Sequence, residues 1–146
     1  MIGWLMPGEA NHLWLSRKVS NAAEMHLSHL GLPVRDEWRS QRFYSVYFGF
    51  DPASAQEYED GTVIIRNADG FDLALHPVGR VEPSPAFLHA GFKAAKPAEV
   101  RALMERMEAD GVTIVERNDE AACVAFKCLD PDGHRIEVYW EPPRSR

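Results

Sequence analysis

Glu137 is a carboxylate in the middle of a run of strand-forming residues, Arg135-Ile-Glu-Val-Tyr-Trp140. The sequence before it, Asp130-Pro-Asp-Gly133, is typical of a tight turn, since proline pre-sets φ and glycine accepts positive φ. Alternation along the strand places Arg135, Glu137 and Tyr139 on one face and apolar residues on the other. A half-buried carboxylate must be paired, protonated or bound to a metal, because an unpaired charge away from water is costly.

Two histidines occupy matching places in an internal repeat. His29-Leu-Gly-Leu recurs as His89-Ala-Gly-Phe, and Asp69-Gly-Phe-Asp-Leu-Ala-Leu recurs as Asp132-Gly-His-Arg-Ile-Glu-Val. A repeat of whole supersecondary units is stronger evidence than a single motif. The pattern predicts an α+β fold in which two βαβββ modules, at about 25–78 and 86–141, form curved mixed sheets round a shared cleft.

The expected elements follow from local signals. Asp36 is expected to cap a helix that Gly49 ends, and Pro97 to open a second helix that Gly111 ends. Strands are expected at about 25–34 and at 62–66, 71–76, 87–94, 112–116, 122–129 and 135–140. An irregular stretch at 51–61 is expected to contain a short or distorted strand, and 78–85 is expected to be a linker. Residues 1–24 are interpreted as an N-terminal extension with a short helix between Glu9 and Glu24, and residues 142–146 as a tail.

Composition limits the class of protein and of partner. The chain has 146 residues, 45% of them hydrophobic, and a formal net charge of −6. This is enough for one domain with a substantial core, and the acidity argues against nucleic acid or an anionic membrane as partner. No apolar run reaches the length of a spanning helix, and Cys123 and Cys128 are expected to be reduced packing residues on opposite faces of one strand. These features predict a cytoplasmic protein.

Pseudo-symmetry of the repeat is expected to bring His29, His89 and Glu137 to one concave face. Two imidazoles and one carboxylate are a ligand set for one divalent metal ion, Fe, Mn, Zn or Ni, with positions left for water or a chelating substrate. A strand histidine alone is more often a structural or surface residue, so the prediction depends on the matched repeat positions. Tyr139 shares the face of Glu137 and is a candidate catalytic residue, while Arg135 could bind a substrate anion or remain a solvated rim residue.

The chain resembles the vicinal oxygen chelate superfamily of glyoxalase I, bleomycin-resistance proteins, fosfomycin-resistance proteins and type I extradiol dioxygenases. The resemblance covers about residues 25–141, and its motifs are the His29 strand running into Val34 and Asp36, Phe43-Tyr44 with Phe48-Gly49-Phe50, His89-Ala-Gly-Phe92, and Asp130-Pro-Asp-Gly-His-Arg-Ile-Glu137. It implies paired βαβββ modules with metal ligands at His29, His89 and Glu137. It also implies a substrate that chelates the metal through adjacent oxygens, so that the metal stabilises an oxyanionic intermediate.

Departures from the better-known members narrow the expected activity. Ala74 stands where glyoxalase I has a fourth protein ligand, and His76, two residues on, could replace it or contact substrate from nearby. Gly31 stands where the fosfomycin-modifying enzymes place a threonine. Lys127 stands near the position of the acid/base tyrosine of the dioxygenases, and Tyr139 and His76 could serve that role from other directions.

Two functions remain open at this point. The first is a metal-dependent lyase, isomerase or extradiol-type dioxygenase that acts on a small oxygenated substrate. The second is a metal-free drug-binding protein of the bleomycin-resistance type, which the net acidity would suit if the drug is cationic. A homodimer is expected in either case, because the two sheets would leave strand edges exposed.

Overall fold

The computed structural model describes residues 24–144. The helix expected in the N-terminal extension falls on residues 1–23, outside this range. No helix in the described part of the chain is long and apolar enough to span a bilayer.

Module one is a four-stranded mixed sheet with one helix. Its strands are ordered β1-β4-β3-β2, with β1 parallel to β4 and the other neighbours antiparallel. Asp36 caps the helix as predicted, since its carboxylate accepts a hydrogen bond from the Arg39 backbone N–H at 3.0 Å, and Gly49 ends it at φ 70°. The elements are β1 (His29–Val34), α1 (Glu37–Phe48), β2 (Phe50–Glu57), β3 (Val63–Asn67) and β4 (Asp72–Pro77).

Module two repeats the same topology, with strand order β5-β8-β7-β6. The register repeats as well: Gly31 pairs with Ala74 in the parallel pair of module one, and Gly91 pairs with Glu137 in that of module two. The duplicated βαβββ fold is therefore confirmed. The elements are β5 (Ala90–Lys93), α2 (Pro97–Ala109), β6 (Ile114–Glu120), β7 (Cys123–Leu129) and β8 (Arg135–Trp140).

Several strand boundaries differ from the prediction, and β1 begins at His29, four residues later than expected. The stretch at 51–61, expected to contain a short or distorted strand, holds most of the eight-residue strand β2, whose register against β3 shifts between Asp51 and Gln56. Strand β5 begins only at Ala90, so His89 precedes the strand, because Phe87 and Leu88 lie exposed in the linker and do not pair with β8. Strand β6 continues to Glu120 through its pairing with β7.

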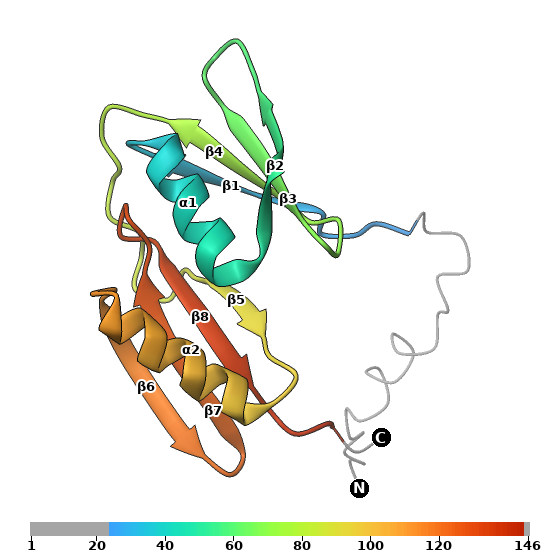
Figure 1. The fold of residues 1–146 in the computed structure, drawn as a ribbon, viewed down its shortest axis with the longest axis vertical. Helices are drawn as coiled ribbons and strands as arrows, with labels where there is room; N and C mark the ends of the chain where they lie inside the picture. Colours follow the sequence, from blue (N-terminus) through green and yellow to red (C-terminus); the bar gives the residue numbers. More distant parts are fainter. Residues whose placement is uncertain (1–23, 145–146) are drawn as a thin grey trace, which may run out of the picture.

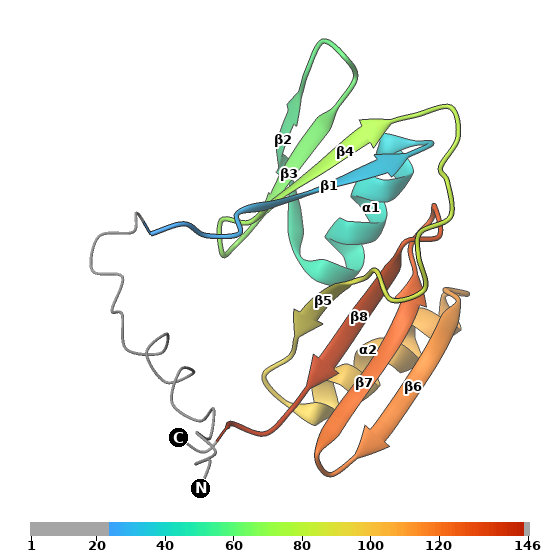
Figure 2. The same ribbon diagram turned by 180° about the vertical axis from the view of Figure 1, so that it is seen from behind.

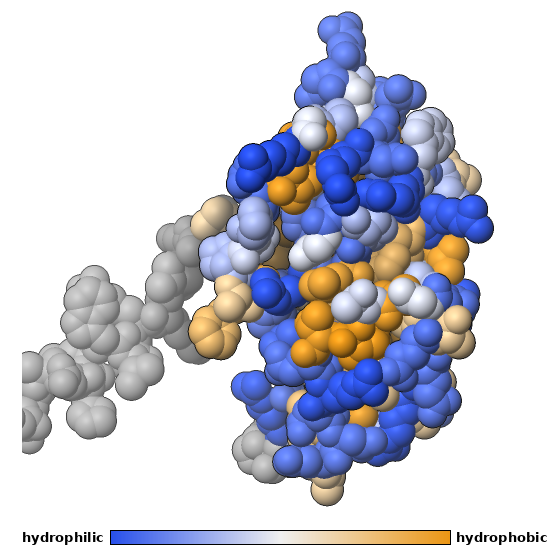
Figure 3. All heavy atoms as spheres, turned by 90° about the vertical axis from the view of Figure 1, so that its left-hand side faces the viewer, coloured by the Kyte–Doolittle hydropathy of each residue, from blue (hydrophilic) through white to orange (hydrophobic). Residues whose placement is uncertain are grey.

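Each helix covers one face of its own sheet, and both helices lie on the same side of the molecule (Figure 1). Figure 2 shows the opposite side, where both sheets present helix-free faces. Buried apolar side chains fill the space between helices and sheets, and the rings of Phe48 and Phe92 stack between the modules with centroids 4.4 Å apart. Viewed from the side, the surface is mostly polar, with the largest hydrophobic area near the middle of this face and smaller ones elsewhere (Figure 3).

The turn before β8 also joins the two modules. The buried Tyr44 hydroxyl of α1 donates a hydrogen bond to Asp130 Oδ2 at 2.7 Å. The side chain of Asp132 is fully buried and accepts hydrogen bonds from Arg35 Nε at 2.8 Å and Ser40 Oγ at 3.2 Å. His134 Nε2 lies 2.7 Å from the Pro33 carbonyl oxygen. The turn therefore fixes how the modules of one chain are oriented, in addition to starting the last strand.

Candidate functional site

His89 and Glu137 lie together on the helix-free face of module two. His89 Nε2 is 3.3 Å from Glu137 Oε2, and their side chains are 30% and 26% exposed. Glu137 points to this face because the alternating burial of β8 sends Ile136 and Val138 into the core. A Cβ added to Gly91 would lie 3.6 Å from Glu137 Oε2, so the glycine leaves the carboxylate accessible from the β5 side.

The backbone orients the imidazole of His89. Its Nδ1 lies 2.9 Å from the carbonyl oxygen of Phe87. A carbonyl oxygen only accepts hydrogen bonds, so Nδ1 donates in this contact and Nε2, the nitrogen nearest Glu137, is the one available to a metal ion bound between the two side chains. Metal-binding histidines are commonly held in this way, with the nitrogen that is not bound to metal donating to a carbonyl or carboxylate.

The separation of the two atoms fits two ligands of one metal ion. Nitrogen and oxygen ligands bind zinc-like ions at about 2.0–2.2 Å, which places adjacent ligand atoms roughly 3.0–3.4 Å apart at octahedral to tetrahedral angles. The observed 3.3 Å lies in this range. His89 and Glu137 can therefore supply two ligands from one chain.

His29 lies on the other module. It begins β1, pairs in register with Asp72 of β4, and is exposed. Arg66 makes a two-pronged ion pair with Asp72, at 2.6 and 2.8 Å, and these hydrogen bonds are the largest cause of the lowered pKa of Asp72, to which the charge of His29 also contributes. Within residues 24–144 no three His, Cys, Asp or Glu side chains gather closely enough to hold a metal. The structure thus brings His89 and Glu137 together and leaves His29 apart from them.

His76 belongs to module one. Its Nδ1 is 3.0 Å from the Thr62 hydroxyl, and its ring lies over Gly31, where an added Cβ would be 3.1 Å from Nε2. In the repeat His76 corresponds to Tyr139, since they pair with Pro33 and Lys93 at equivalent places. Its predicted role in substrate binding stays a prediction.

Tyr139 and Arg135 share the face of Glu137, as predicted from alternation. The Lys93 ammonium lies 5.8 Å from the centroid of the Tyr139 ring. Arg135 Nη1 is 3.5 Å from the carbonyl oxygens of Ser84 and Pro85 in the linker.

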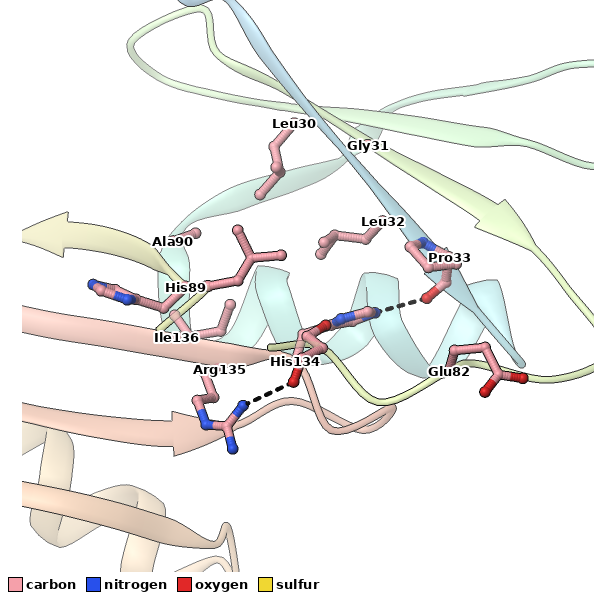
Figure 4. A pocket seen from close by; sticks show the side chains of 12 residues that line it. Leu30, Gly31, Leu32, Pro33, Glu82, His89, Ala90, His134, Arg135 and Ile136 are labelled. Atoms are coloured by element: carbon pink, nitrogen blue, oxygen red, sulfur yellow. Dashed lines mark hydrogen bonds between the residues drawn. The ribbon is translucent and has the colours of Figure 1, made fainter. Parts of the chain in front are cut away.

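Arg135 and His89 also border a cavity of about 300 Å³ between the modules (Figure 4). Its floor is apolar, formed by Leu30 and Leu32 of β1 and by Ile136 of β8. Glu137 does not line it. The cavity therefore adjoins the pair on the His89 side and does not reach Glu137.

Lys127 is a residue of this face that sequence reasoning did not assign to the site. It stands directly opposite Glu137 in the antiparallel pair of β7 and β8. The signal was incomplete, because residue 127 pairs with residue 137 across a five-residue loop at 130–134, whereas a four-residue turn at 130–133 would pair it with residue 136 on the other face.

Residues 26–138 match the model of the Glyoxalase/Bleomycin resistance protein/Dioxygenase superfamily. The chain belongs to this superfamily. Its members commonly bind a divalent metal and small-molecule substrates, and they often form dimers.

Solved structures share the fold. A possible glyoxalase from Bacillus cereus is 28% identical, with a TM-score of 0.67 over 79% of this chain and 98% of that one. The genomically encoded fosfomycin resistance protein of Listeria monocytogenes is 20% identical, with a TM-score of 0.66 over 82% and 96%. A lactoylglutathione lyase from Agrobacterium tumefaciens is 19% identical, with a TM-score of 0.61 over 82% and 96%. No curated protein matches the chain.

Proposed function

We propose that this superfamily member is a divalent-metal-dependent enzyme acting on a small substrate that chelates the metal through two adjacent oxygens. The observation that carries the proposal is the geometry of His89 and Glu137. Their ligand atoms are 3.3 Å apart on an accessible face, and the Phe87 carbonyl holds the imidazole in the tautomer that a metal ligand needs.

The third ligand is His29 of a second copy of the chain. Strand β1 is the edge of one sheet, and strand β5, next to His89, is the edge of the other. Unpaired edges favour association, and a twofold dimer would place β1 of each copy beside β5 of the other. The helix-free faces of different copies would then form one cleft, and two equivalent three-ligand sites would result.

The side chains around the pair have distinct roles in this proposal. The bound metal, Fe, Mn, Zn or Ni, supplies Lewis-acid stabilisation of negative charge on the chelating oxygens. Tyr139 lies on the same strand and face as Glu137, where its hydroxyl could exchange a proton with substrate. Glu137 would hold the metal and could also accept a proton from substrate. Arg135 is placed to bind a substrate anion, and His76 of the second copy would approach from the opposite wall.

The reaction is a lyase, isomerase or extradiol-type dioxygenase reaction. The free Cys123 and Cys128 of the structure fit the reduced, cytoplasmic setting expected from the sequence.

Elemental analysis of protein purified without added metal tests the proposal. We expect a stoichiometric divalent metal in the wild type and its loss in His89→Ala. His26→Ala is the matched control, since it removes an exposed imidazole that precedes β1 and should retain the metal. A screen of metals against α-keto hemithioacetals and catechols would then identify the reaction class.

Absence of metal from both wild type and His89→Ala would contradict the proposal. It would favour the metal-free drug-binding protein, in which a protonated His89 and Glu137 form only an ion pair.

A further inference from the structure

We propose that the substrate carries an anionic group, such as a carboxylate, in addition to its chelating oxygens, and that Lys127 and Arg135 bind this group. The inference rests on the proposed metal-dependent function and specifies the class of substrate. Its basis is a row of charged residues across module two that module one lacks.

The row is a line of paired positions across module two on the helix-free face, with charged residues on β8, β7 and β6 and a glycine on β5. Gly91 of β5 pairs with Glu137 of β8, Glu137 pairs with Lys127 of β7, and Lys127 pairs with Glu116 of β6. Directly opposed side chains have Cβ atoms about 4.5–5.5 Å apart, so the Lys127 side chain begins beside that of Glu137. Its ammonium nevertheless bonds to Glu116 Oε2, at 2.9 Å, which leaves Glu137 to His89.

Module one provides an internal comparison for this row. The equivalent positions there are Gly31, Ala74, Ile64 and Gln56, paired in the same strand order. The same sheet is thus built without a charge at any of these four positions. The fold therefore does not require a lysine at position 127. We infer that Lys127, which stands beside Glu137, functions in the site.

The environment of Lys127 supports a binding role more than a structural one. Its side chain is only 16% exposed, whereas that of its partner Glu116 is 62% exposed. The ion pair itself is exposed and therefore contributes little to stability, while the mostly buried stem of Lys127 holds the ammonium at the surface of the site. A substrate anion bound in the cleft would be less hydrated than the exposed carboxylate of Glu116. It would give the Lys127 ammonium a second and stronger partner.

Arg135 supplies the second cation. It lies on the same face two residues before Glu137 and is the diagonal neighbour of Lys127, at a distance of about 7–8 Å that long side chains can span. Within residues 24–144 its hydrogen bonds go only to two linker carbonyls, both at 3.5 Å, so its guanidinium retains donors for a ligand. Two cations beside the metal-binding pair, in a chain of net charge −6, make this face selective for an acid.

Matched chelators test the inference. Catechol presents two adjacent oxygens without a further charge, and 2,3- and 3,4-dihydroxybenzoate add a carboxylate at two distances from those oxygens. Titration calorimetry on the zinc-loaded, full-length protein measures each dissociation constant. Because hydrogen bonds between charged partners are the strong ones, we expect one of the acids to bind about 10- to 100-fold more tightly than catechol.

Three variants identify the source of that preference. Lys127→Met should reduce the preference, taken as the ratio of the catechol and acid dissociation constants, by about tenfold or more, while Lys127→Arg should retain most of it. The control is Arg101→Met, which removes an equal charge from the exposed ion pair between Arg101 and Asp119, joining α2 to β6. Arg101→Met should bind catechol and the preferred acid as tightly as the wild type does.

The outcomes separate this inference from the proposed function. A protein that binds none of the four candidate metals, Fe, Mn, Zn and Ni, would overturn both. A protein that binds zinc and catechol without preferring either acid would overturn this inference alone, as would a preference that persists in Lys127→Met.

Discussion

Replacing Tyr44 by phenylalanine should weaken the junction between the two modules. The Tyr44 hydroxyl is the only side-chain donor to Asp130 among residues 24–144, bonding Oδ2 at 2.7 Å, while Oδ1 accepts the backbone N–H groups of Asp132 and His134 at 2.9 Å each. Asp130 is 5% exposed, so water cannot easily replace the lost hydroxyl. Burial first, and then the charge of Asp130, raise the pKa of Tyr44, which keeps the hydroxyl protonated and donating.

The expected loss follows from the chemistry of the bond. A hydrogen bond to a charged group contributes about 1.5–3 kcal/mol, and leaving a buried carboxylate oxygen without a donor places Tyr44→Phe near the upper end, about 2–3 kcal/mol. For a domain of this size that corresponds to a fall in melting temperature of roughly 6–12 °C. Urea unfolding followed by circular dichroism, together with a thermal melt, measures both quantities.

Tyr47→Phe is the matched control on the same helix. The Tyr47 hydroxyl also donates to an aspartate at 2.7 Å, Asp110, but this hydrogen bond is exposed. Water can replace it, so the expected loss is below about 1 kcal/mol. Equal losses in the two variants, or a Tyr44→Phe protein as stable as the wild type, would refute the assignment of Asp130 as the buried acceptor that joins the modules.

Two further predictions concern ionisation. Burial acts to raise the pKa of Asp132, but hydrogen bonds from Arg35 and Ser40 and the charge of Arg39 together outweigh it, and the net pKa is lowered. The carboxylate therefore adds stability above about pH 4, and this stability is lost as the pH falls through the lowered pKa. Urea unfolding between pH 6 and pH 3 should show a steeper loss of unfolding free energy for the wild type than for Asp132→Asn. The same dependence of unfolding free energy on pH in both proteins would contradict this. Burial, followed by the charge of Asp130, raises the pKa of the Cys128 thiol to about 12. An aromatic disulfide reagent at pH 8 should therefore label the partly exposed Cys123 in the native protein and Cys128 only after denaturation. Rapid labelling of both cysteines in the native protein would contradict this.

Sequence patterns determined most of the fold because its signals are local. The Asp36 cap, the Gly49 terminus and the alternation that turns Glu137 away from the core each depend on a few neighbouring residues. The duplication followed from residues that recur in register. The short β5 was missed because β propensity at Phe87 and Leu88 does not show that these residues lack a partner strand.

The site was predicted less completely because it depends on how the modules are placed. Pseudo-symmetry of the repeat assigned His29, His89 and Glu137 to one concave face, but it could not show that within one chain only His89 and Glu137 meet. That orientation depends on buried contacts of Asp130 and Asp132 with module one, which are tertiary interactions between distant segments. Contacts between distant segments leave no periodic pattern in the sequence, so they could not be predicted from it.

The most direct test of the proposed metal site is a heterodimer that carries His29→Ala in one copy and Glu137→Ala in the other, purified through two different tags. Each variant alone lacks a ligand in both sites and should contain no metal. In the heterodimer one site combines both substitutions, and the other combines intact His29, His89 and Glu137, so we predict about one metal ion per heterodimer. A heterodimer without metal, prepared from a protein whose wild type binds about two metal ions per dimer, would contradict a site shared between copies.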